Sequence, residues 1–311
     1  METLIHPKGI VVHETQKMIY VTSRDTNTLI KFDPVTNKVV TTVPTGVEPW
    51  DVVILEGLNE IYVSNYGSGD VWVYDANTLA VKKKISVGQN PAMMDYFPFV
   101  NTVAVVVRGY NAIAIIENGN VTQYLESGGI GPYGIAADPL NNQLIVTNRD
   151  TGNAYAYYRD TNGWKMDPGS ELKDFGDTQR TVPFEVAYNW NNNRVYITFV
   201  KPDGQWFVDV FEKETTTRIR RIATIHVGNS GSENDANVGG SGLVINPETN
   251  NLFVTDTRAG TITVIGPDNT VKATIPIGTD PYEIAVNRDT QTVYVTLRAA
   301  NRLAWFADNY K

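Results

Sequence analysis

Short apolar runs separated by polar turns follow one another along the whole chain, and they differ in a regular order. The first run of each series is unbroken and rich in β-branched residues, as at residues 10–12, 52–54 and 284–286, which is typical of a strand buried on both faces. Turns rich in Asn, Asp and Pro, as at residues 138–142 and 246–250, lead into a second apolar run. Asx side chains favour such turns because they bond their own backbone. The pattern predicts antiparallel strand pairs.

Third and fourth runs complete each series and become more polar. The third run alternates apolar and polar residues, as at 71–75 and 261–265. The fourth run carries lysines, as at 81–85 and 271–275, and suits an outer edge because lysine discourages edge-to-edge pairing. Each series therefore predicts a four-stranded sheet whose first strand is innermost and whose fourth is outermost.

The series recurs as an internal repeat. Prolines lead six units at positions 7, 49, 91, 132, 183 and 281, and Gly240 leads a seventh. Successive units begin 42, 42, 41, 51, 57 and 41 residues apart. Seven such units predict an all-β, seven-bladed β-propeller with four-stranded antiparallel blades, which occupies residues 1–311 as a single domain.

A short motif in the second run of most units carries a family resemblance. It reads Tyr-Val-Thr-Ser at 20–23, Tyr-Val-Ser-Asn at 62–65, Ile-Val-Thr-Asn at 145–148, Phe-Val-Thr-Asp at 253–256 and Tyr-Val-Thr-Leu at 294–297. The chain resembles the YVTN-repeat family of seven-bladed β-propellers, which includes surface-layer and secreted or periplasmic proteins. The resemblance implies the fold and an extracellular, periplasmic or cell-surface location after removal of a signal peptide, with a cytoplasmic location as the alternative. It implies no activity, because the repeat packs blades and carries no chemistry of its own.

The last unit ends after its third run, near residues 303–308, so a fourth strand must come from another segment. The short N-terminal segment at residues 1–5 is expected to close this last blade. Because that segment is only a stub, we expect either a short fourth strand or an open outer edge.

Composition narrows the range of partners. Twenty-six basic and thirty-four acidic residues give a net charge of −8 without a basic block, so nucleic acid is not an expected partner. Cysteine is absent, which removes disulfides and thiolate metal sites. The most apolar run, residues 103–107, is far below membrane-spanning length. We expect a monomer without a membrane span that binds a protein, a glycan or a small anionic ligand.

The lead prolines mark the propeller face on which a site is expected. Positions two and seventeen residues past each lead place acids and arginines on one rim around the central channel. Arginine offers planar donors to carboxylate or phosphate, so the rim predicts an anion-binding ring. The candidate ligand-binding residues are Arg108, Arg298, Arg24, Arg149, Tyr133 and Trp50.

Ion pairs between blades offer a competing explanation for this rim. Arg24 lies one blade before Asp51, and Arg149 lies one blade before Glu185. The same count places glycine opposite Arg108 and Arg298, which makes these two arginines the better ligand candidates. Arg298 could still be satisfied by Glu283 within its own blade.

Two longer loops, at residues 177–181 and 228–240, make the same face asymmetric. The second loop is rich in oxygen-bearing side chains and offers Glu233 and Asp235 as weak candidate ligands for a divalent cation such as calcium. It lacks the spacing of an EF-hand loop, and a solvated loop explains the same composition. No other cofactor is expected.

The leading functional hypothesis is a ligand- or partner-binding propeller, because the repeat is regular, only three histidines occur and the rim charges can pair internally. The alternative is a lyase or lactonase acting on an anionic sugar acid or lactone at the channel mouth. A tyrosine beside an arginine could remove a proton next to a carboxylate whose charge the arginine neutralises. The candidate catalytic residues of this alternative are Tyr66, Arg108, Arg298, Glu283 and His6.

Overall fold

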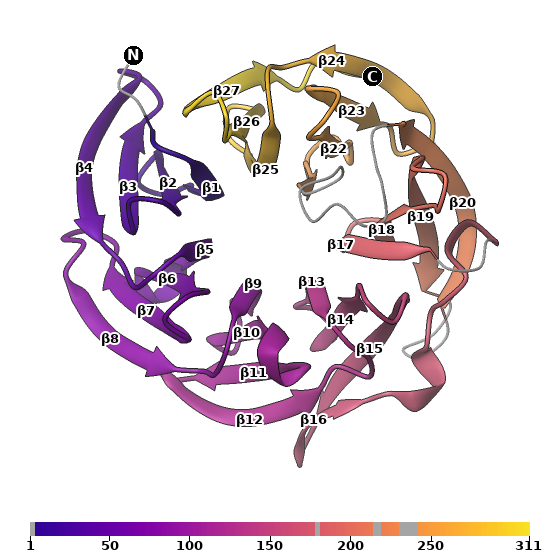
Figure 1. The fold of residues 1–311 in the computed structure, drawn as a ribbon, viewed down its shortest axis with the longest axis horizontal. Coiled ribbons are helices and arrows are strands. Elements are labelled where there is room, and N and C mark those ends of the chain that lie inside the picture. The colour runs from indigo at the N-terminus through magenta and orange to yellow at the C-terminus, as the bar shows by residue number, and fades with distance from the viewer. Residues whose placement is uncertain (1–3, 178–180, 214–218, 230–241) are drawn as a thin grey trace.

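Seven small antiparallel sheets stand in a ring around a central channel (Figure 1). The computed structural model describes residues 4–177, 181–213, 219–229 and 242–311. In these residues, six sheets have four strands in chain order and the seventh has three. The seven-bladed all-β propeller predicted from the repeat is confirmed.

The strands run from the channel outward in every blade. The first three blades contain β1 (Pro7–His13), β2 (Met18–Ser23), β3 (Thr28–Asp33) and β4 (Lys38–Pro44), then β5 (Pro49–Leu55), β6 (Glu60–Asn65), β7 (Asp70–Asp75) and β8 (Val81–Ser86), then β9 (Pro91–Phe97), β10 (Thr102–Val107), β11 (Ala112–Glu117) and β12 (Asn120–Glu126). The fourth and fifth blades contain β13 (Pro132–Asp138), β14 (Gln143–Asn148), β15 (Asn153–Asp160) and β16 (Gly163–Met166), then β17 (Val182–Asn189), β18 (Arg194–Val200), β19 (Trp206–Lys213) and β20 (Ile219–Gly228). The last two contain β21 (Leu243–Ile245), β22 (Leu252–Asp256), β23 (Thr261–Ile265) and β24 (Val271–Pro276), then β25 (Pro281–Asn287), β26 (Thr292–Leu297) and β27 (Arg302–Ala307). Four short 3₁₀ helices lie in connections: η1 (Glu56–Leu58), η2 (Arg108–Tyr110), η3 (Pro168–Ser170) and η4 (Phe175–Asp177).

Burial follows the predicted gradient from the innermost to the outermost strand. Every residue of the innermost strands β13 and β25 is buried, whereas most residues of the outermost strands β4 and β8 are exposed. The apolar core lies between neighbouring blades, where second and third strands pack face to face, as with Val105 of β10 against Val73 of β7. Seven inter-blade interfaces thus replace one central core, and the centre of the ring is left as a channel.

The hydroxyl in the repeated motif of the second strand joins neighbouring blades. The N–H of Gly9 donates to Thr22 Oγ1 (2.9 Å), and this hydroxyl donates to the carbonyl of Trp50 in the next blade (3.2 Å). Ser64, Thr147, Thr255 and Thr296 repeat the arrangement at later blade junctions. The third blade has Val106 at this position, and there the Asp95 carboxylate accepts the N–H of Ala137 in the next blade (2.7 Å).

In the described residues, contacts of the innermost strand β1 with β25 and β26 close the ring. Thr296 Oγ1 of the last blade donates to the carbonyl of Lys8 in the first blade (3.0 Å). The N-terminal segment meets the last blade at its third-strand turn, where the N–H of Leu4 donates to the Asn301 carbonyl (3.0 Å). No residue of the described ranges pairs with β27 as a fourth strand. Of the two expected forms of closure, the described part of the last blade has the open outer edge.

Candidate ligand-binding channel

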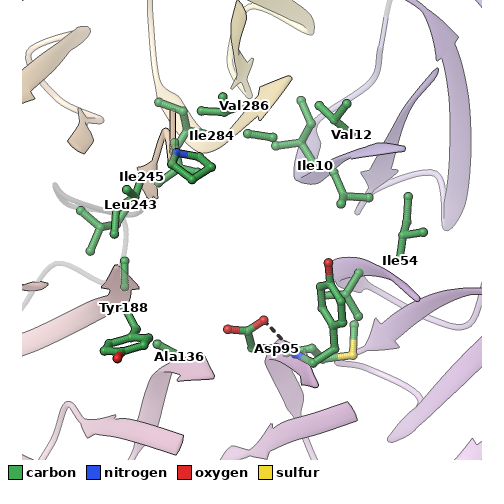
Figure 2. A pocket seen from close by; sticks show the side chains of 18 of the residues that line it. Ile10, Val12, Ile54, Asp95, Ala136, Tyr188, Leu243, Ile245, Ile284 and Val286 are labelled. Atoms are coloured by element: carbon green, nitrogen blue, oxygen red, sulfur yellow. Dashed lines mark hydrogen bonds between the residues drawn. The ribbon is translucent and has the colours of Figure 1, made fainter. Parts of the chain in front are cut away.

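The innermost strands of all seven blades enclose a cavity of about 730 Å³ along the axis of the propeller. Figure 2 shows aliphatic side chains from different blades that point toward the opening. These side chains come from the unbroken β-branched runs, because residues at alternate positions of a first strand face the same side. The aliphatic wall consists of Ile10, Val12, Ile54, Ile245, Ile284 and Val286.

The cavity reaches the face opposite the lead prolines. Its outer lining comes from the turns that join first to second strands, including Pro98, Trp190 and Pro247. The charged residues of this mouth are four acids and one base: Glu14, Glu56, Glu248, Asp289 and Arg288. A smaller hollow of about 370 Å³ adjoins the mouth and includes the exposed side chains of Phe99 and Leu140. The sequence pointed to the proline face, and the cavity instead opens on the other one.

Three carboxyl groups lie at the inner end of the cavity, on the second residue past the lead position. They are Asp51 of β5, Glu185 of β17 and Glu283 of β25, and their residues are only 7%, 5% and 9% exposed.

The equivalent position in each preceding blade is a glycine. A Cβ atom built on Gly134 would lie 2.4 Å from the Phe184 carbonyl and 2.9 Å from Glu185 Cα. Gly9 stands in the same relation to Asp51, and Gly242 to Glu283. Glycine is therefore required where an acid-bearing first strand approaches its neighbour.

The acids of the channel differ in their hydrogen bonds. Asp51 accepts the N–H groups of Val52 and of Met94 in the next blade, both at 2.8 Å, so its carboxylate joins two blades. Asp95 is used in the same way one blade later. In contrast, Glu185 and Glu283 each keep a buried Oε1 atom without a hydrogen-bond partner in the described residues. Of the three carboxyl groups at the inner end, those of the two glutamates therefore have spare hydrogen-bonding capacity.

Burial sets the protonation of these groups, because desolvation penalises a charged carboxyl. It raises the pKa of Asp51 to about 7 and that of Asp95 to about 6, against the effect of their backbone hydrogen bonds. The pKa values of Glu185 and Glu283 are raised well above the usual range by burial and then by the neighbouring carboxyl groups. Without a bound cation, the inner end of the channel therefore favours protonated glutamates.

A buried lysine and two tyrosines occupy the channel on the proline side of the carboxyl groups. Lys8 Nζ donates to the Tyr282 hydroxyl (3.1 Å) and lies 2.8 Å from the centroid of the Trp50 ring. The Tyr282 hydroxyl lies 3.3 Å from that of Tyr133, which reaches it from the fourth blade. Burial, and then the charge of Arg298, lowers the pKa of Lys8 well below its usual value. These side chains fill the axis at the channel end where the sequence placed the candidate site.

The rim arginines stack on aromatic rings. Arg24 lies over Trp50, Arg108 over Tyr133 and Arg149 over Phe184, with 5.7, 5.6 and 5.0 Å from each guanidinium carbon to the ring centroid. Each ring belongs to the residue after the lead proline of the next blade. Cation–π contacts of this kind join blades, which is the role that the sequence assigned to ion pairs with Asp51 and Glu185.

Carboxylate partners of the arginines differ from those expected. Arg24 pairs with Glu48 (3.2 Å) instead of Asp51. The expectation that Arg298 lacks a carboxylate partner other than Glu283 is wrong, because Asp280 holds its guanidinium through two atoms at 2.8 and 3.1 Å. Asp280 directly precedes the lead proline of the same blade, Pro281.

The other predicted site residues are dispersed. His6 pairs with Asp25 at the rim (2.7 Å), and Tyr66 stacks on Trp50 at a centroid distance of 4.7 Å. Of the five residues in the catalytic alternative, only Glu283 lines the cavity. Glu233 and Asp235 lie outside the described residues. Within the described ranges, no three His, Cys, Asp or Glu side chains are placed to share a metal ion, and no helix is long and apolar enough to cross a membrane.

Sequence reasoning missed the opposite mouth and the layer formed by Lys8 and the acids. A signal was present, since glycine in one unit is followed by an acid at the same position of the next unit in three pairs, which are Gly9 and Asp51, Gly134 and Glu185, and Gly242 and Glu283. Sequence alone does not show that each glycine makes room for the following strand. The acids were therefore interpreted as partners for rim arginines.

Fold and cavity together define a seven-bladed β-propeller with an axial channel whose wall combines aliphatic and polar side chains and which ends in buried carboxyl groups. No protein-family model matches the sequence, and no curated protein sequence matches it significantly.

Many solved structures have a similar fold, among them the following three. Hydrazine synthase of Kuenenia stuttgartiensis matches with a TM-score of 0.80 and 16% identity over 100% of this chain and 97% of that chain. A streptogramin B lyase matches with a TM-score of 0.74 and 14% identity, covering 98% of this chain and 94% of that chain. The selenomethionine-substituted virginiamycin B lyase from Staphylococcus aureus matches with a TM-score of 0.75 and 14% identity, covering 98% and 97%. At these identities the similarity concerns the fold alone.

Proposed function

We propose that this protein is a binding propeller that takes a small ligand into its axial channel from the face opposite the lead prolines. The cavity of about 730 Å³ carries the proposal. Its size lies within the range of small-molecule sites, and its wall combines aliphatic side chains with buried polar groups that could orient a ligand.

The lyase or lactonase alternative receives less support from the geometry. It needs an arginine, a tyrosine and a base around one opening, whereas Arg298 is held by Asp280 and Tyr282 is bonded to Lys8. The two lyases among the similar structures are too distant in sequence to transfer an activity. Export to the periplasm or cell surface remains a prediction from the repeat resemblance, and sequencing the N-terminus of the natural protein tests it.

A ligand screen with a channel-blocking variant tests the binding function. Purified protein is screened by thermal shift against amines, neutral apolar compounds, sugar acids and lactones, because a ligand at one hundred times its Kd stabilises the folded state by about 2.7 kcal/mol. Ile245→Trp adds a large ring to a partly exposed side chain of the channel wall. Val40→Trp, on the exposed outer strand β4, is the matched control.

We expect a stabilising ligand whose effect is lost in Ile245→Trp and kept in Val40→Trp. Stabilisation that persists in Ile245→Trp would place the ligand elsewhere. Turnover of a sugar acid or lactone that survives the channel block would favour the enzyme alternative.

A further inference from the structure

We infer that the channel binds an organic ammonium ion, with its charged head at Glu185 and Glu283 and its apolar body along the aliphatic wall. The inference rests on the proposed function and specifies the ligand class for the same cavity. The observation that carries it is a pair of buried carboxyl groups with unused hydrogen-bonding capacity at the inner end of that cavity.

The two glutamates have no structural task that explains their burial. Glu185 and Glu283 are 5% and 9% exposed, they line the cavity, and each has an unpartnered Oε1 atom in the described residues. Asp51 beside them gives both of its oxygens to backbone N–H groups. A buried polar atom without a partner destabilises the fold, because it has lost its hydrogen bonds to water. A donor that arrives with a ligand would restore hydrogen bonding to these carboxyl groups.

The nearby lysine does not supply that donor. Lys8 Nζ is turned to the Tyr282 hydroxyl and the Trp50 ring, and Lys8 forms no ion pair in the described part of the chain. Burial lowers its pKa, which favours the neutral amine. Arg298, the next cation, is held by Asp280. The two glutamates are therefore free to serve an external cation.

The shape and polarity of the cavity indicate an organic cation. An ammonium group offers two or three N–H donors to a pair of carboxyl oxygens, and charge-assisted hydrogen bonds of this kind are the strong ones. The aliphatic side chains of the wall cover part of an apolar body when it binds, and removing that apolar surface from water stabilises the complex. An anion would instead meet three carboxyl groups. The carboxyl groups of the cavity thus favour a cation, whereas the sequence predicted an anion on the proline rim.

The charges at the mouth of the channel also favour a cationic ligand. Four carboxylate side chains and one guanidinium surround it. Although Lys17 pairs with Asp289, acids outnumber bases at the mouth, and an excess of one sign of charge attracts ligands of the opposite sign and speeds their entry. A cation that reaches the inner end also favours the ionised form of the two glutamates, whose pKa values burial otherwise raises.

Three probes with one apolar body and different charge test the inference. 4-Phenylbutylammonium, 4-phenylbutanol and 4-phenylbutanoate are titrated into the protein by calorimetry at pH 7.5. We expect the ammonium compound to bind at least ten times more tightly than the alcohol, and the carboxylate to bind most weakly. Glu185→Gln and Glu283→Gln should each weaken ammonium binding at least tenfold. Glu126→Gln, on the exposed part of β12, is the matched control and should leave binding unchanged.

The outcomes separate the ligand class from the binding function. If the alcohol or the carboxylate binds as well as the ammonium compound and Ile245→Trp blocks that binding, the ammonium inference fails while the binding function stands. Failure of the ammonium probe to bind at millimolar concentration also overturns the inference, and the ligand screen then decides the function separately. Unchanged ammonium affinity in both glutamine variants, with circular dichroism showing them folded, places the head group elsewhere and overturns it as well.

Discussion

Replacing Gly134 with alanine tests the close approach that brings the acids into the channel. The new Cβ would lie 2.4 Å from the Phe184 carbonyl oxygen and 3.0 Å from the Val186 nitrogen, both backbone atoms of β17. Real contacts of this kind essentially never fall below 3.0 Å, so β17 must move by about 0.6 Å. That movement is opposed because the Thr147 hydroxyl holds the Phe184 carbonyl and the Phe184 ring packs on Trp206 at a centroid distance of 4.9 Å.

We expect Gly134→Ala to lower the free energy of unfolding by about 1–3 kcal/mol, the usual range for overpacking. Gly57→Ala is the matched control, because a Cβ there meets nothing within 4 Å. The same substitution at such a site is neutral or stabilising by about 0.4–1 kcal/mol, through the unfolded chain. Urea unfolding followed by tryptophan fluorescence measures both. If Gly134→Ala unfolds at the same urea concentration as Gly57→Ala, the close approach of the inner strands is refuted.

Two further predictions concern the ring junction and the acids of the channel. Thr296→Val removes the hydroxyl that bonds the Glu283 N–H and the Lys8 carbonyl and should lower the free energy of unfolding by about 2–4 kcal/mol. The control Thr41→Val, on the exposed strand β4, should change it little, and equal urea midpoints for the two variants would contradict the role of this junction. Since burial raises the pKa of Asp51 to about 7 and that of Asp95 to about 6, the folded state binds more protons than the unfolded state between pH 5 and 7. The free energy of unfolding should therefore fall by about 1–3 kcal/mol as pH rises across this range, and urea unfolding that shows an increase would contradict the assignment.

The order of strands within a blade and the number of blades could be predicted, because each depends on local sequence. The lysines at residues 82–84 mark an outer strand, and β8 is that strand. The β-branched run at residues 284–286 marks a buried inner strand, and β25 is buried throughout. The repeat period then fixes the number of blades, since each unit buries its apolar face only against its neighbours.

Candidate site residues were harder to predict because their partners lie in other blades. Arg24 and Arg149 contact the next blade, as the repeat count indicated, but their stacking on Trp50 and Phe184 was not foreseen. Arg108 was expected to lack a partner in the next blade, and it stacks there on Tyr133. The contact between the Tyr133 and Tyr282 hydroxyls joins residues 149 positions apart, and no pattern in the sequence connects them. Counting along a repeat gives the blade of a residue and its position along the strand, but not the direction in which its side chain points.

By itself, the sequence determined the all-β class, the seven blades and their order from channel to edge, because hydrophobic period and turn chemistry are local properties of the chain. Only the tertiary structure decided which end of the channel is open. Lys8, Trp50, Tyr133 and Tyr282 converge from four blades and fill one end, whereas Glu185 and Glu283 face the cavity that opens at the other. These side chains come from blades that are far apart in the sequence. They contact one another and are buried only when the ring is closed, so local sequence cannot show which of them pack together and which face the cavity.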